Sequence, residues 1–146
     1  VFLPASEKQL MEKKIIPQEI VKGVERILLV DDEEMIVKVG KRMLSKLGYE
    51  ILTAGSGREA LEIYRENREN IDMVLLDMIM PEMSGSSTFD NLKKINPKIK
   101  VLLSSGYSIN GRAAEILGRG CNSFIQKPFN LSHLSKKIRE VLADKD

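Results

Sequence analysis

Short apolar runs alternate with amphipathic helical patterns from Glu25 onward, and this alternation is the feature that most limits the possible folds. The runs are continuously apolar, as in strands that are buried on both faces of a sheet. They occupy Ile27–Val30, Tyr49–Ala54, Met73–Leu76, Val101–Leu103 and Ser123–Ile125. Five strands alternating with five helices predict a doubly wound α/β fold, in which helices cover both faces of a five-stranded parallel sheet.

Each helical pattern has apolar residues three or four positions apart, which places them on one stripe of a helix. The expected stripes are Ile36, Val39, Met43 and Leu47; Leu61 and Tyr64; Phe89, Leu92 and Ile95; Ala113, Ile116 and Leu117; and Leu131, Leu134, Ile138 and Val141. Gly48 is expected to end the first helix, and Gly118 and Gly120 the fourth. Asn96-Pro97 is expected to end the third helix.

The first 24 residues lack this alternation. Their mixed charge and weak periodicity, interrupted by Pro17, predict a linker with a short helix near Glu7–Lys14. We therefore expect the compact domain to occupy residues 25–146. The chain begins with Val1, and the first four residues read as the end of a strand without a partner, so we expect an excerpt of a longer protein.

Composition excludes several classes of protein. The chain has 146 residues, of which 42% are hydrophobic, and this suits one globular domain. Lys and Arg number 23 against 21 Asp and Glu, in an interspersed order, so nucleic acid is not an implied partner. No apolar run approaches the roughly 20 residues of a membrane span. The single cysteine, Cys121, fits a structural thiol in a reducing cytoplasm.

Polar residues follow four of the predicted strands, and the carboxyl ends of parallel strands meet at the edge where ligands bind. The residues are Asp31, Asp32, Asp77, Ser104 and Lys127. Two ionised carboxylates about 4 Å apart repel by about 4 kcal/mol at an effective dielectric constant of about 20, so three such groups must take up a proton or bind a cation. Oxygen ligands with open positions suit Mg²⁺. A lysine and a hydroxyl complete a predicted site for phosphoryl transfer.

Four motifs at these strand ends resemble the receiver domain of response regulators in two-component phosphorelays. They are Val30-Asp31-Asp32-Glu33, Leu76-Asp77-Met78-Ile79-Met80-Pro81-Glu82-Met83-Ser84-Gly85, Ser104 and Lys127-Pro128-Phe129. The resemblance extends from about Glu25 to Ala143 and implies a flavodoxin-like (βα)5 sandwich with strand order 2-1-3-4-5. It implies a histidine kinase or histidine phosphotransfer protein as partner, and a possible homodimer through the fourth helix, fifth strand and fifth helix.

The resemblance also implies a role for each acidic residue. Asp77 would be the phosphoacceptor, which attacks the phosphohistidine of the partner. Asp32, Asp77 and the backbone carbonyl of Ile79 would bind Mg²⁺, the one implied cofactor, and Asp31 would act through a water. The domain would thus promote its own phosphorylation and dephosphorylation.

The remaining implied roles belong to the fourth and fifth strands. Ser104 would donate its hydroxyl to the phosphoryl group and shift on phosphorylation, while Phe124 turns inward. Lys127 would pair with a phosphoryl oxygen, and the bond before Pro128 would be cis.

Two positions depart from the common pattern of this family. Position 79 is often polar in similar domains and is Ile here, and Gly106 follows Ser104 by two residues. In the family that the chain resembles, these positions tune the attack of water on the acyl phosphate, so we expect the lifetime of phospho-Asp77 to change in Ile79→Asn. The segments 104–108 and 2–4 are similar to those of hybrid histidine kinases, so we expect a C-terminal receiver of such a kinase.

Two other interpretations remain open on the sequence alone. Residues 55–60 match the dinucleotide fingerprint G-x-G-x-x-G/A, and Asp77 lies where a ribose-binding acid could lie. This interpretation leaves Asp31, Asp32 and Lys127 without a role, and the chain is short for a dinucleotide fold with a substrate site. The other is a degenerate receiver that acts only as an interaction module, which the complete acidic set opposes.

Overall fold

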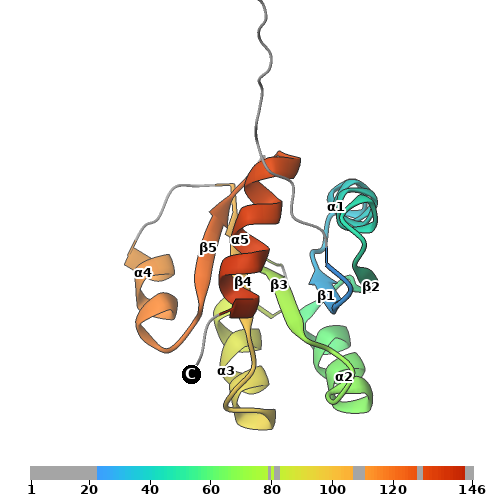
Figure 1. Ribbon diagram of the computed structural model, residues 1–146. Coiled ribbons are helices and arrows are strands. Elements are labelled where there is room, and N and C mark those ends of the chain that lie inside the picture. Colours follow the sequence, from blue (N-terminus) through green and yellow to red (C-terminus); the bar gives the residue numbers. More distant parts are fainter. Residues whose placement is uncertain (1–22, 79, 81–82, 107–110, 128–129, 144–146) are drawn as a thin grey trace, which may run out of the picture.

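The computed structural model describes residues 23–78, 80, 83–106, 111–127 and 130–143. In these residues strands and helices alternate along the chain (Figure 1). The elements are β1 (Arg26–Val30), α1 (Glu34–Lys46), β2 (Glu50–Ala54), α2 (Gly57–Asn67), β3 (Met73–Asp77), α3 (Gly85–Ile95), β4 (Val101–Ser105), α4 (Gly111–Gly118), β5 (Ser123–Gln126) and α5 (Leu131–Ala143). The expected linker and its short helix lie almost wholly outside the described residues.

The five strands form one parallel sheet in the order β2-β1-β3-β4-β5, which confirms the doubly wound α/β fold. The chain order reverses at β1, because β2 lies on one side of this strand and β3 on the other. In such sheets, ligands bind beyond the carboxyl ends of the strands at this reversal. The register pairs Val30 with Leu76, so the polar residues after β1 lie beside the end of β3. Asp77, at the end of β3, pairs in turn with Ser104 of β4.

Two hydrophobic clusters cover the two faces of the sheet. Leu44 of α1 and Leu134 and Ile138 of α5 pack on one face, and Tyr64 of α2 and Phe89 of α3 pack on the other. Every residue of β3 is buried, as expected for a central strand covered on both sides. The apolar faces of the helices therefore hold the sheet in place, and the sheet in turn sets the positions of the residues at the ends of its strands.

The face that α1 presents to the sheet matches the predicted stripe only in part, because Met43 and Leu47 pack in the core as expected and Val39 does not. Val39 was expected in the core, but 49% of its surface is exposed, whereas Gly40 and Leu44 are buried. A Cβ on Gly40 would lie 3.0 Å from a methyl carbon of Leu29, so the helix approaches β1 closely at this glycine. Apolar residues occupy two adjacent stripes of α1, and the side that contains Gly40 and Leu44 lies closest to the sheet.

The ends of the elements differ slightly from the predicted ends. Gly48 has a φ of +95° after α1, as its place at the helix end predicts. After α4 the positive φ belongs to Gly120, at +104°, while Gly118 is the last residue of the helix. The third helix ends at Ile95, before Asn96. The strands β3 and β4 extend to Asp77 and Ser105, so both residues are held by the sheet itself.

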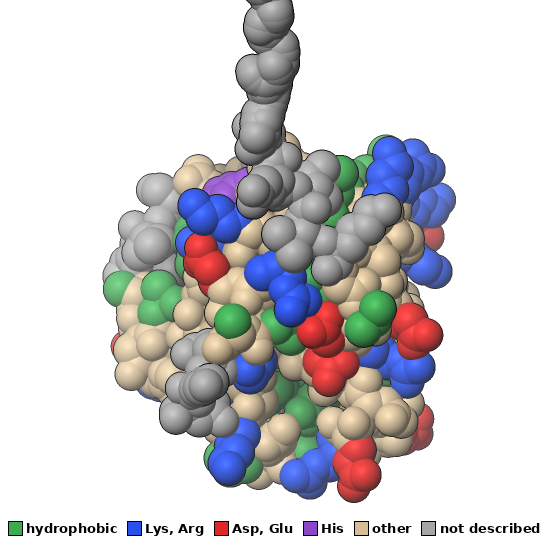
Figure 2. Space-filling view, in the orientation of Figure 1, with side chains coloured by type: hydrophobic (Ala, Val, Ile, Leu, Met, Phe, Trp, Pro, Cys, Tyr) green, Lys and Arg blue, Asp and Glu red, His purple; other side chains and the backbone are tan. Residues whose placement is uncertain are grey.

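The cationic side chains of α1 gather on its outer face, although the whole chain carries a formal charge of only +2. Figure 2 shows this group of Lys and Arg side chains at the upper right, over α1. Its members that line one surface hollow are Lys38, Lys41, Arg42 and Lys46. Within the described part of the chain, no helix is both long and apolar enough to cross a bilayer.

Candidate functional site

Three carboxylates meet at the carboxyl edge of the sheet, beside the strand reversal. Asp31, Asp32 and Asp77 each offer an oxygen, and these oxygens lie within 4.8 Å of one another. The side chains of Asp31 and Asp77 are almost fully buried, whereas Asp32 is exposed. The pairing of β1 with β3 causes this meeting, because it sets the residue after Val30 beside Asp77. The structure thus brings together the three acids that the sequence predicts for a metal site.

Lys127 lies between the two buried carboxylates. Its Nζ donates to Asp31 Oδ2 at 2.6 Å and to Asp77 Oδ1 at 3.1 Å. Its backbone N–H donates to the carbonyl of Ser105 at 2.7 Å, which continues the pairing of β5 with β4 and sets the reach of the side chain. Burial disfavours the ammonium, but the hydrogen bond to Asp31 and the charge of Asp77 outweigh it, so the pKa of Lys127 is raised.

Among the residues that the structure describes, three carboxylates of this site face the ammonium of Lys127, so their charges are not balanced when all four groups are ionised. Buried or crowded anions need a compensating charge or must take up a proton. The donor set consists of oxygens, and Asp32 at its exposed side leaves access from solvent. These properties fit a hard divalent cation such as Mg²⁺ or Ca²⁺, which prefers carboxylate and water ligands.

The buried Asp31 has a different environment from its neighbour Asp32. Its Oδ1 accepts a hydrogen bond from the backbone N–H of Glu33 at 2.9 Å, and its Oδ2 accepts one from Lys127. Both oxygens therefore already have protein donors. Glu33 is the N-cap residue of α1, yet its own side chain makes no capping bond, so the carboxylate that orders this turn is that of Asp31.

The backbone around Asp77 is held by two neighbouring elements. The N–H of Met78 donates to the carbonyl of Ser104 at 2.8 Å, and the N–H of Gly85 donates to the carbonyl of Met78 at 2.9 Å. A Cβ on Gly85 would lie 2.5 Å from the carbonyl oxygen of Asp77, so the first residue of α3 has to be glycine. The sequence pattern included Gly85 but did not reveal this close approach, which depends on how α3 returns to β3.

Ser104 and Phe124, the two predicted switch residues, both belong to the sheet. Ser104 is 3% exposed and pairs in register with Asp77, so it lies directly beside the phosphoacceptor candidate. Phe124 is partly buried and packs against the cluster that contains Ile116. Two other predicted features, the carbonyl of Ile79 and the bond before Pro128, lie outside the described residues.

The dinucleotide interpretation of residues 55–60 is wrong. The N–H of Gly55, which would face a pyrophosphate, donates instead to Glu59 Oε1 at 2.7 Å. That carboxylate would repel a phosphate at the same position. A Cβ on Gly57 would overlap Thr88 Oγ1 of α3, so this glycine serves the packing of two helices. The glycine pattern has a structural cause and leaves no anion site.

Comparison with protein families matches residues 27–139 to the response regulator receiver domain. Among curated proteins, the chain is 36% identical over 135 residues to the sensor kinase CckA of Brucella abortus, covering 92% of this chain and 14% of that protein. It is 34% identical over 117 residues to the chemotaxis protein CheY of Thermotoga maritima, covering 80% of this chain and 96% of that protein. The chain thus spans a small part of the kinase and almost all of the chemotaxis protein.

Solved structures show the same fold. A response regulator receiver domain from Clostridium thermocellum superposes with a TM-score of 0.78 at 34% identity, over 82% of this chain and 94% of that one. The response regulator TrrA of Thermotoga maritima, described in complex with Mg²⁺ and BeF, superposes with a TM-score of 0.73 at 33% identity, over 81% of this chain and 99% of that one. With the strand order and the acidic edge, these matches show that the chain belongs to the response regulator receiver domain family.

Proposed function

We propose that this receiver domain accepts a phosphoryl group on Asp77 in a reaction that requires Mg²⁺. The observation that carries the proposal is the meeting of Asp31, Asp32 and Asp77 with the ammonium of Lys127 at the strand reversal. Phosphoryl transfer needs mainly positioning and neutralisation of charge, and this site offers both.

The residues that would hold the metal are Asp32 and Asp77, together with the backbone carbonyl of Ile79. Asp31 would act through a water, because both of its oxygens already accept hydrogen bonds from Glu33 and Lys127. The likeness to TrrA, which is described with Mg²⁺, supports the choice of metal. When bound, Mg²⁺ would neutralise charge on the carboxylates and on the incoming phosphoryl oxygens.

The nucleophile in this scheme is a carboxylate oxygen of Asp77. It forms a bond to phosphorus while the bond from phosphorus to the histidine nitrogen of the donor breaks, and the imidazole leaves with that electron pair. Lys127 Nζ, now 3.1 Å from Asp77 Oδ1, would then pair with a phosphoryl oxygen. Its raised pKa keeps the ammonium charged throughout the physiological range. The side chain of Ser104, buried beside Asp77, would donate its hydroxyl to another phosphoryl oxygen.

The donor would be the phosphohistidine of a histidine kinase or of a histidine phosphotransfer protein. It has to approach the exposed side of the site, which Asp32 borders. Met35 and Val39 of α1 are 71% and 49% exposed and follow Asp32 closely in the chain, so they offer apolar contact to that donor. Docking there would bury apolar surface without changing the fold of the receiver.

Phosphorylation would change the surface formed by α4, β5 and α5. The side chain of Phe124 is only partly buried, so an inward rotation toward the cluster would bury more of it as Ser104 moves to the phosphoryl group. The phosphoryl group on Asp77 would add a doubly charged group at the sheet edge, and this charge would favour the rotated position of Phe124. This surface would then select partners or a second copy of the chain.

We also propose that the chain is the C-terminal receiver of a hybrid histidine kinase in the cytoplasm. The match to the sensor kinase CckA extends over 135 residues, whereas the match to CheY covers 117. The longer match to the kinase supports the proposal that the chain is part of a kinase of this type. The sequence 1–24 would then be the linker that joins the receiver to the preceding domain.

Intact mass after incubation with acetyl phosphate and Mg²⁺ tests the proposed function. We expect the wild type to gain one phosphoryl group, and Asp77→Asn to gain none. The matched control is Asp72→Asn. This exposed aspartate directly precedes the first residue of β3, at the other end of the strand from Asp77, and its substitution should leave the gain in mass unchanged. A wild-type chain that binds Mg²⁺ but gains no mass, even from a phosphorylated histidine phosphotransfer protein, would favour the interaction-module alternative.

A further inference from the structure

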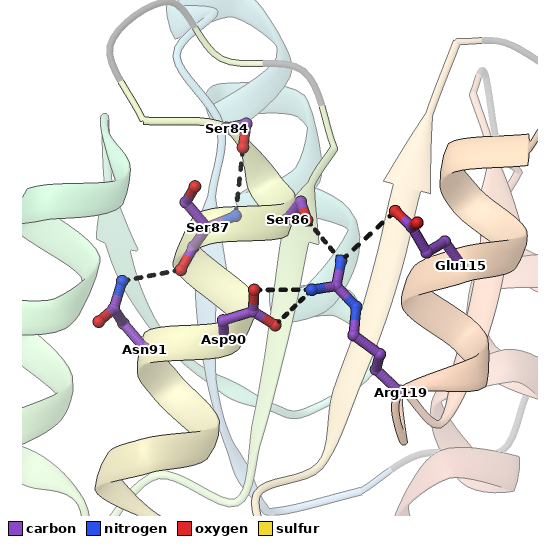
Figure 3. A network of polar contacts seen from close by, with 7 residues as sticks. All are labelled: Ser84, Ser86, Ser87, Asp90, Asn91, Glu115 and Arg119. Atoms are coloured by element: carbon purple, nitrogen blue, oxygen red, sulfur yellow. Dashed lines mark hydrogen bonds and ion pairs between the residues drawn. The ribbon is translucent and has the colours of Figure 1, made fainter.

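Arg119, in the turn between α4 and β5, connects this turn to the outer face of α3 (Figure 3). Its Nη1 donates to both carboxylate oxygens of Asp90, at 2.9 and 2.7 Å, and its Nη2 donates to Ser86 Oγ at 2.6 Å. Glu115 of α4 lies 3.9 Å from Nη2. One guanidinium therefore joins two side chains that lie one turn apart on α3 with a side chain of α4.

The part of α3 that Arg119 holds is the part next to the phosphoacceptor. Ser86 directly follows Gly85, the residue that lies against the carbonyl of Asp77 and donates to the carbonyl of Met78. Because one helical turn moves as a unit, a displacement of Ser86 displaces the Gly85 N–H as well. The guanidinium is thus separated from the peptide of the phosphoacceptor by two adjacent residues.

The other side of the connection is the carboxyl end of α4. The N–H of Arg119 donates to the carbonyl of Ile116, whose side chain is fully buried in the core. The next residue, Gly120, lies against the side chain of Lys93 on α3, since a Cβ there would be 3.3 Å from Lys93 Nζ. Ser86, Asp90 and Lys93 follow the spacing of one helix face. The turn after α4 therefore rests along the outer face of α3.

We propose, building on the proposed function, that Arg119 is a positioning residue which couples α4 to the backbone of the phosphoacceptor through the first two turns of α3. A change at Asp77 that moves the peptide of Met78 would reach the carboxyl end of α4 through Gly85, Ser86 and Arg119. The coupling is reciprocal. Without Arg119 the turn of α3 that lies against the carbonyl of Asp77 would be held less firmly, so the chain would bind a phosphoryl group or its mimic more weakly.

The solvent exposure of the ion pair between Arg119 and Asp90 distinguishes this positioning role from a contribution to overall stability. The side chains of Arg119 and Asp90 are 38% and 42% exposed, and ion pairs with such exposure contribute little to the free energy of unfolding. Loss of Arg119 should therefore alter local order and coupling while the melting temperature stays nearly constant. A lysine cannot replace it fully, because a single ammonium is a point charge that does not span Asp90 and Ser86 as the planar guanidinium does.

The first arm of the test measures amide hydrogen exchange by NMR in the chain without ligand. In Arg119→Gln we expect faster exchange at the amides of Gly85 and Met78, with an intermediate effect in Arg119→Lys. The matched control is Arg68→Gln, at an exposed arginine after α2, which should leave both amides unchanged. Exchange at Gly85 and Met78 that matches the wild type in Arg119→Gln would overturn the positioning role.

The second arm measures the affinity for beryllofluoride in the presence of Mg²⁺. We expect Arg119→Gln to weaken it by about fivefold, with an unchanged melting temperature, and Arg68→Gln to match the wild type. Faster exchange with an unchanged affinity would overturn the coupling to the phosphoacceptor. A wild type that neither binds beryllofluoride nor accepts a phosphoryl group would contradict the proposed function instead, while the exchange arm still decides whether Arg119 positions α3.

Discussion

At the scale of single residues, the site consists of three carboxylates that the pairing of β1 with β3 holds close together, so that they repel one another. Asp31 and Asp77 are buried and share Lys127, while Asp32 faces solvent. Function and stability therefore oppose each other here, since the arrangement that would bind a metal destabilises the chain without one. Such conflicts are expected at functional sites.

The Asp32→Asn variant tests this conflict. Removing one exposed like charge within 4.8 Å of the others should raise the free energy of unfolding by about 1 kcal/mol when a chelator is present. Mg²⁺ should then raise the melting temperature of the wild type, and of Asp32→Asn much less, because a ligand that binds only the folded state stabilises it. Thermal unfolding with chelator and with Mg²⁺ measures both effects. Equal gains from Mg²⁺ in both chains would argue against Asp32 as a ligand.

The single cysteine provides a second residue-level prediction. Burial raises the pKa of Cys121 from 9.0 to about 11, against weaker opposing contributions from hydrogen bonds at Ser123 and Leu103. Between pH 9 and 11 the unfolded chain would lose this proton while the folded chain keeps it, so stability falls as the pH rises, by at most about 2 kcal/mol.

Urea unfolding of the wild type and Cys121→Ala from pH 8 to pH 11 isolates this contribution. Cys121→Ala should start less stable, because the side chain is buried, but should lose less stability over the upper part of the range. Parallel pH profiles would contradict the raised pKa. The sequence already indicated a structural thiol, and the closed environment of Cys121 agrees with it.

At the scale of elements, close packing depends on small residues where two helices or a helix and a strand meet. Gly57, the first residue of α2, leaves no room for a Cβ beside Thr88 and Met83. Gly118, the last residue of α4, has no heavy atom within 4 Å of the Cβ that it would gain. The two glycines therefore make a matched pair in which only the surroundings differ.

We expect Gly57→Ala to lower the free energy of unfolding by about 1 to 3 kcal/mol, because the side chain would overlap α3. Gly118→Ala should raise the free energy of unfolding by up to about 1 kcal/mol, since alanine favours a helix and open space is present. Chemical denaturation of both variants measures these changes. A neutral Gly57→Ala would show that α3 can move away from α2 at little cost.

Elements were predicted more reliably than their packing faces. The continuous apolar runs predicted each strand within two residues, because burial on both sides leaves a strong local pattern. The core face of α1 was predicted correctly at Met43 and Leu47 but not at Val39, because the sequence has apolar residues on two stripes and Gly40 approaches Leu29 closely. Contacts between distant residues left no local trace: Arg119 binds Ser86 and Asp90, 33 and 29 positions away.

At the scale of the whole molecule, the start of the described chain is connected to the last helix. Arg139 of α5 donates to Glu25 Oε1 at 3.0 Å and to the hydroxyl of Tyr49 at 3.3 Å, and the N–H of Gly23 donates to the carbonyl of Leu47. Burial alone would raise the pKa of Glu25, but its backbone hydrogen bond and Arg139 outweigh it, so this pKa is lowered. The segment that enters the domain is thereby joined to α5.

This connection predicts a pH dependence at acid pH. Because the pKa of Glu25 is lower in the folded chain, its contribution is complete above the ordinary pKa and is lost as the pH falls through the folded value. Arg139→Gln should be slightly less stable near pH 7 and should lose less stability between pH 5 and pH 3 than the wild type. Urea midpoints at both ends of this range provide the test. Equal losses of stability in the two chains between pH 5 and pH 3 would show that the pair of Glu25 and Arg139 does not contribute to the pH dependence of stability.

The central claim, that Asp77 is the phosphoacceptor, can be tested by chemical trapping. Borohydride reduces an aspartyl phosphate to homoserine, so the chain would be incubated with acetyl phosphate and Mg²⁺, reduced, digested and analysed by peptide mass spectrometry. The account predicts homoserine at position 77, only when Mg²⁺ is present. Homoserine at Asp31, Asp32 or another acid, with Asp77 intact in a phosphorylated chain, would contradict it.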